Sequence, residues 1–285
     1  MNGIRAGWAR RTRRLRRVRS LLLAVVIIAS VLPLAWTVLA SLGVHPDNVS
    51  SPPAWSIRPA LEQYAEVGAA EVGFWGELAT SITTSAASTL LTIVISLLAA
   101  YSLVHSRMRG KTRLVQGLLI LASVPVMAYA IPLDTTVRAL GIYDTFIGVV
   151  LAQAAIFAPL GAYVLFGYLA QVTFDFEEAA RLEGASPWRT IVEVILPMNA
   201  PGVVATAIIV FVLNWNSFLA PMVLTTHHVR TIPIAMSDFF TFDRELYWPT
   251  AAAALTVSIL PLAALVAASS RVLQRFFLGA VVDMG

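Results

Sequence analysis

The sequence has no cysteine, a single lysine, and no charged residue inside any of its six long apolar runs. The absence of cysteine excludes disulfides, thiolate metal sites and covalent haem attachment. Hydrophobic residues make up 58% of the 285 residues and charged residues only 13%, with a mean hydropathy of +0.77. This balance is too apolar for a soluble domain of such length and indicates a membrane protein.

Each of the six apolar runs is long enough to cross a hydrocarbon core as a helix, which takes about 20 residues. The runs are residues 21–42, 78–104, 114–133, 146–170, 201–224 and 249–270. Most contain proline, which membrane helices tolerate because neighbouring groups satisfy the freed backbone carbonyl. We therefore predict an all-α integral membrane protein. Its expected divisions are a basic segment at 1–20, a six-helix transmembrane domain at 21–272 and a tail at 273–285.

Basic residues fall mostly on one side of the predicted spans. Sixteen lie on the side that carries both termini, eight of them before residue 20, and four lie on the other side. Because basic residues near span ends stay in the cytoplasm, both termini are predicted to be cytoplasmic. The basic head followed by residues 21–34 is also compatible with a signal peptide, although the apolar run continues to residue 42 without a small-residue cleavage pattern.

The predicted cytoplasmic loop at residues 172–200 is long for a simple connection, which suggests folded structure with a function. Glu177 and Arg181 are spaced as an i, i+4 ion pair on a first short helix. Gly184 can end that helix in a left-handed turn.

A second short helix is predicted in the same loop. Ser186 can cap its N-terminus, with Pro187 at the first helical position, and Pro197 is expected to stop it. The loop should therefore form two helices joined by a tight turn, a compact projection that a soluble protein can receive in a groove.

The loop contains Glu178, Ala179 and Ala180, then Gly184 after three residues, and Val194, Leu196 and Pro197 after nine more. This pattern resembles the EAA loop of binding-protein-dependent ABC importer permeases. That pattern is Glu-Ala-Ala, three residues, Gly, nine residues, an aliphatic residue, one residue and Leu-Pro. The positions that match it are Glu178, Ala179, Ala180, Gly184, Val194, Leu196 and Pro197. In that family the loop docks on an ATPase subunit. The resemblance implies a type I importer permease fold with termini in the cytoplasm. It also implies an ATPase-coupling loop that includes Ser186 and Pro187, with ATP and Mg bound by the partner ATPase.

Three further stretches resemble the maltose-type carbohydrate permeases in particular. They are residues 53–64 in the first outer loop, 131–142 between the third and fourth spans, and 214–218 in the fifth span. The last stretch is similar to a Trp-Asn-x-Phe signature of that family. The resemblance implies a sugar as the transported solute.

Polar residues in the fifth run are candidates for a translocation path: Asn214, Trp215, Asn216 and Ser217. Amides are costly in hydrocarbon and usually face a partner helix or a water-filled path. Asn216 lies roughly 200° from Asn214 around a 3.6-residue helix, so both amides cannot line one path unless the helix is broken. Either amide can serve as an interhelical hydrogen-bonding group. Alternatively, one of them contacts a hydroxyl-rich solute, with Trp215 as a stacking platform.

Two other groups of residues are weaker candidates. Gly110, Lys111 and Thr112 resemble the end of a phosphate-binding loop, but the glycine required five positions earlier is replaced by His105. His227 and His228 are adjacent, and neighbouring residues rarely point at one metal ion. We therefore expect no bound cofactor, no metal and no catalytic site in this chain.

The lack of ionisable residues in the six runs argues against a proton- or sodium-driven transporter. We expect a multi-pass permease of the bacterial cytoplasmic membrane that imports a neutral sugar or polyol by alternating access. Its expected partners are a second permease subunit in a heterodimer, two ATPase subunits, an external solute-binding protein and membrane lipids, with no nucleic acid. Two alternatives stay open. One is a permease for a charged solute such as glycerol phosphate, a polyamine or an amino acid, and the other is a non-transporting membrane docking protein.

Overall fold

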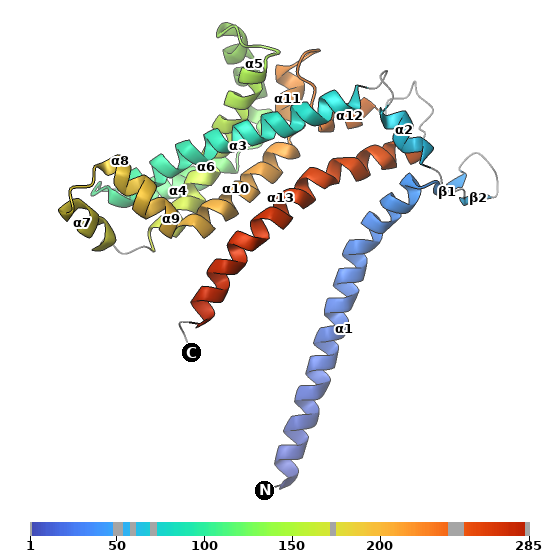
Figure 1. Cartoon of the computed structure of the whole chain (residues 1–285), viewed down its shortest axis with the longest axis horizontal. Coiled ribbons are helices and arrows are strands. Elements are labelled where there is room, and N and C mark those ends of the chain that lie inside the picture. Colours follow the sequence, from blue (N-terminus) through green and yellow to red (C-terminus); the bar gives the residue numbers. More distant parts are fainter. Residues whose placement is uncertain are drawn as a thin grey trace. The chain divides into compact units, whose positions relative to one another are not determined.

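The computed structural model describes the backbone of residues 2–47, 54–57, 61–68, 73–171, 175–238 and 248–282. This part of the chain is helical apart from one pair of four-residue strands, which confirms the predicted all-α class (Figure 1). It divides into two compact units. The first contains α1, β1, β2, α2 and the first turns of α13, through residue 257. The second contains α3 to α12 and the rest of α13.

The first unit is built around the predicted first span. Its elements are α1 (Asn2–Ser41), β1 (Val44–Asp47), β2 (Ala54–Ile57) and α2 (Glu62–Gly68). β1 and β2 are antiparallel, and Val44 pairs with Ile57. The Ser41 and Tyr64 hydroxyls lie 2.7 Å apart and connect the end of α1 to α2. We did not predict the strand pair, because four-residue strands carry too little alternation to be recognised without their partner.

The second unit carries the remaining helices. They are α3 (Phe74–His105), α4 (Lys111–Ala122), α5 (Val126–Ala139), α6 (Phe146–Leu169), α7 (Asp175–Leu182), α8 (Pro187–Thr190), the π-helix η1 (Ile191–Ile195), α9 (Leu196–Met198), α10 (Ala200–Trp215), α11 (Leu219–Leu224) and α12 (Ile232–Asp238). The last helix, α13 (Trp248–Val282), contributes to both units.

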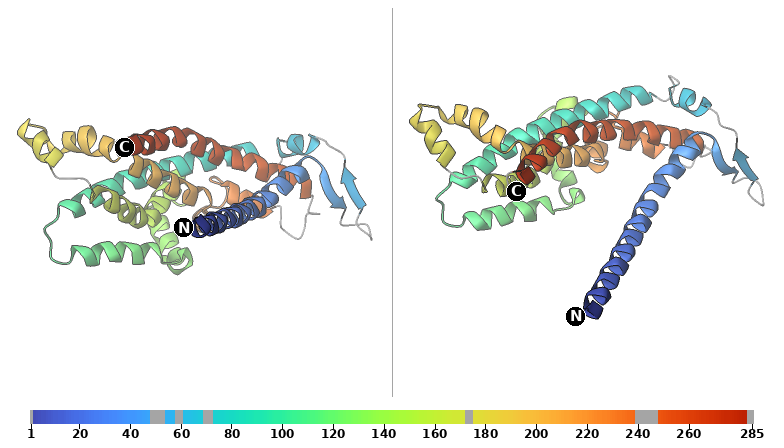
Figure 2. Two further views of the ribbon diagram at one scale, coloured as in Figure 1. Left: turned by 90° about the horizontal axis from the view of Figure 1, so that it is seen from below. Right: turned by 60° about the horizontal axis from the view of Figure 1, so that its bottom comes forward.

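The core of the second unit lies where α3, α6 and α10 pack together (Figure 2). Small residues allow close approach of these helices, as is usual for membrane bundles. A Cβ added at Gly202 in α10 would stand 2.5 Å from the Tyr168 ring of α6. Leu97 of α3 and Leu165 of α6 are buried together with Ile195 of η1. The core therefore extends into the 172–200 loop.

Among the residues that the structure describes, four helices are long and apolar enough to cross a membrane, and two bent helix pairs raise the number to six if each pair forms one span. The run at 114–133 was expected to form a single helix, and this prediction was wrong. It is divided into α4 and α5, which meet at 88°. The break lies at Pro125, which adopts extended backbone and has no N–H to continue the α4 hydrogen bonds.

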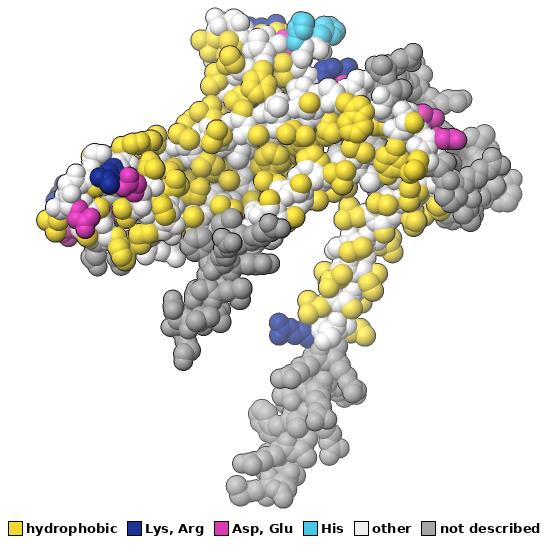
Figure 3. All heavy atoms as spheres, in the orientation of Figure 1, with side chains coloured by type: hydrophobic (Ala, Val, Ile, Leu, Met, Phe, Trp, Pro, Cys, Tyr) yellow, Lys and Arg dark blue, Asp and Glu magenta, His cyan; other side chains and the backbone are white. Residues whose placement is uncertain are grey.

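The run at 201–224 is also divided, because α10 ends at Trp215 and α11 begins at Leu219. A second bend of 82° separates the helical segment Pro187–Met198, which comprises α8, η1 and α9, from α10. The surface of the second unit that Figure 3 shows is largely apolar, and charged side chains gather at the end where α7 and α8 lie. This distribution fits a bundle that lipid or another apolar surface covers.

Asp144 joins two connecting segments of the second unit. It lies in the turn between α5 and α6 with a positive φ of 53°. Its carboxylate accepts hydrogen bonds from the backbone N–H groups of Thr226, His227 and His228 at 3.1 to 3.3 Å. The α5–α6 turn is therefore held against the segment that follows α11.

Candidate functional site

The 172–200 loop folds largely as its sequence predicts. Gly184 ends the first helix with a φ of 83°, a conformation that glycine adopts without steric cost. Ser186 caps the second helix by accepting a hydrogen bond from the Arg189 N–H at 3.3 Å, and Pro187 occupies the first helical position. The two-helix projection is thus confirmed.

The end of the second helix differs from our prediction. Helical backbone continues past Pro197 to Met198, whereas we expected Pro197 to stop it. The preceding turn is η1, in which the Leu196 N–H bonds to the carbonyl of Ile191. Pro197 has no backbone N–H, so it cannot make the α-helical hydrogen bond at this point.

The residues that match the EAA pattern lie on different faces of the loop. Glu178 and Ala179 are exposed, whereas Ala180 is buried. Gly184, Ser186, Pro187 and Pro197 are exposed, and Val194 and Leu196 are partly buried. The structure therefore brings Glu178, Ala179 and the 184–187 turn to the surface of one projection.

Three large apolar side chains are also exposed on this projection. The exposed fractions are 53% for Phe176, 85% for Leu182 and 64% for Trp188. Exposed apolar groups of this size, among charged residues, are typical of a surface that another protein covers. We did not identify these three residues from the sequence, because helical periodicity alone does not show which face meets the bundle.

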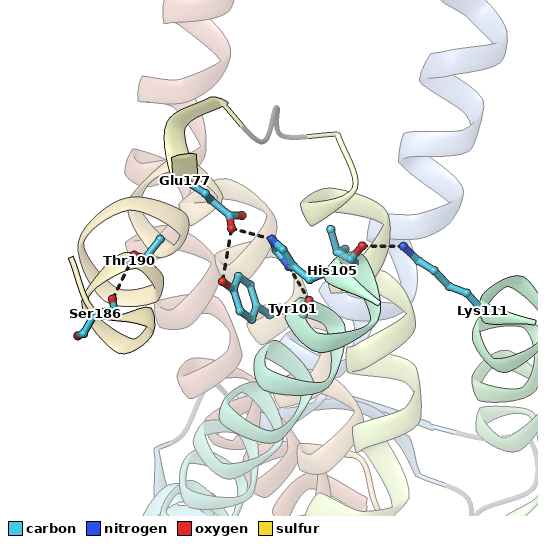
Figure 4. A network of polar contacts seen from close by, with 7 residues as sticks. Tyr101, His105, Lys111, Glu177, Ser186 and Thr190 are labelled. Atoms are coloured by element: carbon cyan, nitrogen blue, oxygen red, sulfur yellow. Dashed lines mark hydrogen bonds and ion pairs between the residues drawn. The ribbon is translucent and has the colours of Figure 1, made fainter. Parts of the chain in front are cut away.

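Glu177 has a different partner from the one we predicted. Among the described residues its ion pair is made with His105 and not with Arg181: His105 Nε2 lies 2.6 Å from Glu177 Oε2. The Tyr101 hydroxyl also donates to Glu177 Oε2, at 3.4 Å. Figure 4 shows both side chains of α3 pointing toward the carboxylate of α7. The predicted i, i+4 pair does not form because Glu177 is on the buried face of α7 and Arg181 is exposed.

A cleft of about 770 Å³ opens beside this contact. The end of α3 lines one side, through His105, and α7 lines the other, through Glu178 and Arg181. Lys111 closes the C-terminus of α3 by donating to the Val104 carbonyl at 2.7 Å. We weighed residues 110–112 as part of a phosphate-binding loop. In the structure the lysine of this segment instead caps a helix.

The candidate path residues are separated by the end of α10. Asn214 and Trp215 are buried, whereas Asn216 is exposed and Ser217 is partly buried. Asn214 Nδ2 donates to the Thr89 hydroxyl of α3 at 3.2 Å. The Trp215 ring stacks on Phe211, with centroids 6.0 Å apart. The two amides therefore face different surroundings, as helical geometry requires.

Gln153 of α6 completes a buried polar group with Asn214. The Gln153 side-chain oxygen accepts a hydrogen bond from the Ser88 hydroxyl of α3 at 2.9 Å, and the Gln153 side-chain nitrogen donates to the backbone carbonyl of Asn214 at 3.4 Å. We did not identify Gln153 or Ser88 from the sequence. The available signal was the row of Ser and Thr residues along one face of α3 and the single amide in the fourth run.

Comparison with known proteins identifies the family. Residues 92–278 match the family described as "Binding-protein-dependent transport system inner membrane component". The chain belongs to this family. It is accordingly a multi-pass inner-membrane protein, as the apolar runs predicted. The matched region begins within α3 and includes the whole 172–200 loop.

Several relatives of this inner-membrane component are named as sugar permeases. The chain is 29% identical to the trehalose/maltose transport system permease protein MalG of Thermococcus litoralis over 86% of this chain and 87% of MalG. It is 33% identical to the trehalose transport system permease protein SugB of Mycobacterium tuberculosis, over 65% of this chain and 69% of SugB. It is 28% identical to the glucose import system permease protein GlcU of Saccharolobus solfataricus, over 65% and 64%.

Solved structures show that this inner-membrane component has an importer fold. A chain of a bacterial ABC transporter that imports alginate superposes with a TM-score of 0.73 over 93% of this chain and 97% of that chain, at 19% identity. The MetNI methionine ABC transporter superposes with a TM-score of 0.54 over 71% of this chain, at 16% identity. At these identities the likeness concerns the fold alone.

Proposed function

We propose that the chain is a permease subunit of an ATP-driven importer that moves a neutral sugar or polyol across the cytoplasmic membrane by alternating access. The family match supports the transport role. The named substrates of MalG, SugB and GlcU support a sugar, and so does the absence of ionisable residues from the six apolar runs. The chain has no catalytic role in this proposal, since ATP and Mg bind to the partner ATPases.

The observation that carries the proposal is the exposed surface of the 172–200 loop. Leu182, Trp188 and the acidic Glu178 are all exposed on α7 and α8, and the turn at Gly184 has open space around it. A surface of this kind fits the groove of an ATPase subunit, in which a basic residue would meet Glu178. The exposed Ala179 leaves room for close approach.

Continuity of the loop with the core supports coupling. Ile191 and Ile195 of η1 are buried against α3 and α6, and α9 leads into α10 through the 82° bend. When ATP draws two ATPases together, a push on α7 and α8 would therefore reach the helices of the bundle without passing through a flexible linker. A second permease subunit and an external solute-binding protein complete the proposed importer.

The segment at 214–217 remains our candidate for the path. The Asn216 amide is exposed at the end of α10, where it can meet a hydroxyl-rich solute. Asn214 lies in the bundle and links α10 to α3. Asn216 and Ser217 are therefore the residues we would substitute first in a test of solute specificity.

The coupling loop can be tested by co-purification of the tagged chain with its ATPase subunits. Gly184→Asp places a charged side chain in the docking turn, and we expect it to leave the protein in the membrane but abolish ATPase binding and transport. Gly141→Asp is a matched control, because Gly141 also has a positive φ, of 70°, and open space around it, but lies in the α5–α6 turn. Equal ATPase binding by both variants would refute the coupling role.

The solute class is tested with the reconstituted importer. Sugar-stimulated ATP hydrolysis, in the presence of the binding protein, is the expected result. Stimulation by glycerol phosphate, a polyamine or an amino acid instead would replace the sugar with a charged solute. ATPase binding without stimulation by any solute would favour a docking protein that does not transport.

A further inference from the structure

The fifth apolar run is interrupted between the end of α10 and the start of α11. In a continuous helix the Asn214 carbonyl would accept from the N–H of residue 218. The Asn214 carbonyl instead accepts from the Ser217 N–H at 3.1 Å and from the Gln153 side-chain nitrogen at 3.4 Å. Backbone groups freed by a break are costly away from water, so this carbonyl needs other partners. Gln153 therefore supports the end of α10 from a neighbouring helix.

Gln153 is itself held from a second helix. Its side-chain oxygen accepts from the Ser88 hydroxyl of α3, and only 1% of the residue is exposed. Gln153 is the single amide residue of α6, whose other residues are apolar, glycine or tyrosine. An amide buried in an apolar bundle is costly unless its donor and acceptor find partners. Both ends of the Gln153 amide have a partner, one on α3 and one on α10.

Asn214 has a further attachment through its side chain. The Asn214 side-chain nitrogen donates to the Thr89 hydroxyl of α3, whereas Asn214 Oδ1 is buried and has no hydrogen-bond partner among the described residues. An unpaired buried acceptor destabilises a fold, so a polar group that served stability alone would pair this oxygen. The incomplete pairing favours a role for this group beyond holding the bundle together.

Asn216 follows directly after the turn that Gln153 supports. The Asn216 side-chain nitrogen donates to the Val212 carbonyl at 2.7 Å, one helical turn back. This bond uses one of the two amide hydrogens and leaves the second hydrogen and the side-chain oxygen of an exposed residue for another partner. A hydroxyl group both donates and accepts, so it suits this pair of atoms. The direction of the Asn216 amide is set by the last turn of α10.

We propose that Gln153 is a positioning residue for solute recognition, because it fixes the last turn of α10 and with it the direction in which the Asn216 amide meets a solute hydroxyl. The proposal rests on the importer function and on the path proposed above. Breaks in spanning helices form the solute sites of many membrane transporters, so support of such a break affects solute affinity. Gln153 itself stays buried and acts through Asn216.

The position of Asn216 can be measured on the full-length chain without its partners. The chain has no cysteine, so Asn216→Cys supplies a unique site for a spin label at the end of α10. Gln153→Met keeps the length of the side chain but removes both hydrogen bonds, and should raise the mobile fraction of the label about two- to tenfold. Gln116→Met is the matched control, because Gln116 is exposed on α4, and should leave the label unchanged. An unchanged label in Gln153→Met would overturn the proposal.

Ser88→Ala is the milder variant, because it removes the hydrogen bond to the Gln153 oxygen and leaves the donor to the Asn214 carbonyl in place. It should raise the mobile fraction less than Gln153→Met does. If Gln153→Met does not accumulate in the membrane, Ser88→Ala decides the outcome, and an unchanged label in Ser88→Ala would then refute the positioning role.

Solute recognition is measured as the KM and the maximal rate of uptake of trehalose, maltose and glucose by the reconstituted importer. Gln153→Met and Asn216→Ala should each raise KM about two- to tenfold and change the maximal rate less. Because Gln153 acts through Asn216, Gln153→Met should raise KM no further when it is combined with Asn216→Ala. A purely structural role of Gln153 would reduce the amount of active importer without this dependence on Asn216.

The outcomes separate this proposal from the function on which it rests. A wild-type KM in Gln153→Met, or an equal increase of KM with and without Asn216→Ala, would refute the positioning role. A wild-type KM in Asn216→Ala would refute the proposed path. If the wild-type importer takes up none of the three sugars, the sugar proposal fails, and the spin label still decides whether Gln153 positions residue 216.

Discussion

The Asp144 carboxylate should stabilise the folded chain more than a partly exposed carboxylate usually does. Burial by itself raises the pKa of this group, but hydrogen bonds from four consecutive backbone N–H groups, residues 226–229, outweigh it and lower the pKa from 3.8 to about 2. At ~1.36 kcal/mol per pKa unit the shift corresponds to roughly 2 kcal/mol. Because the group is partly exposed, screening by water reduces this to roughly 1 kcal/mol.

The backbone of Asp144 adds a second contribution. Its φ of 53° lies in the left-handed region, which Asp and Asn tolerate and which costs alanine roughly 1–2 kcal/mol. Asp144→Ala loses both contributions and should destabilise the folded chain by roughly 2–3 kcal/mol. Asp144→Asn keeps the backbone preference and should lose roughly 1 kcal/mol. Asp144→Gly relieves the strain but not the lost hydrogen bonds, and should lie between them.

The assay is the apparent unfolding midpoint of the purified chain, recorded at one scan rate because membrane proteins often unfold irreversibly. At roughly 2–4 °C per kcal/mol for a chain of about this size, Asp144→Ala should lower the midpoint by roughly 4–12 °C at pH 7. Since the folded-state pKa is depressed, the contribution of the charge is present above about pH 4 and is lost as the pH falls toward 2. The difference between wild type and Asp144→Asn should therefore narrow at pH 3. The reasoning fails if Asp144→Asn unfolds with the wild type at pH 7, or if alanine and glycine are equivalent.

Two further predictions concern the core of the second unit. Gly202→Ala should destabilise the bundle by roughly 1–3 kcal/mol, because the new methyl group would meet the Tyr168 ring at 2.5 Å. Gly167→Ala is the control and should not destabilise the bundle, because open space surrounds Gly167. Similar unfolding midpoints for the two variants would contradict this prediction. Asn214→Leu should lower the unfolding midpoint, since it removes the buried hydrogen bond to Thr89 of α3. Asn216→Leu should lower the midpoint less, because the Asn216 amide is exposed and donates to the Val212 carbonyl of its own helix.

Much of this protein follows from local sequence features. The spacing of Gly184, Ser186 and Pro187 predicted the turn of the 172–200 loop, because left-handed backbone and helix caps each depend on one or two residues. The order of apolar runs predicted the long helices, except in the runs at 114–133 and 201–224, each of which is divided into two helices. The loop also carried the family resemblance that the match to residues 92–278 confirmed.

Contacts between residues far apart in the sequence could not be predicted from local sequence features. Local spacing pairs Glu177 with Arg181, but packing turns Glu177 toward His105, 72 residues earlier in the chain. The same holds for Gln153 with Ser88 and for Asp144 with the 226–228 backbone. The sequence by itself determined the membrane class, most of the long helices and the turn at Gly184, since these depend on composition and on neighbours within a few residues. Only the tertiary structure decided which polar groups meet, because that depends on which face each helix buries against another.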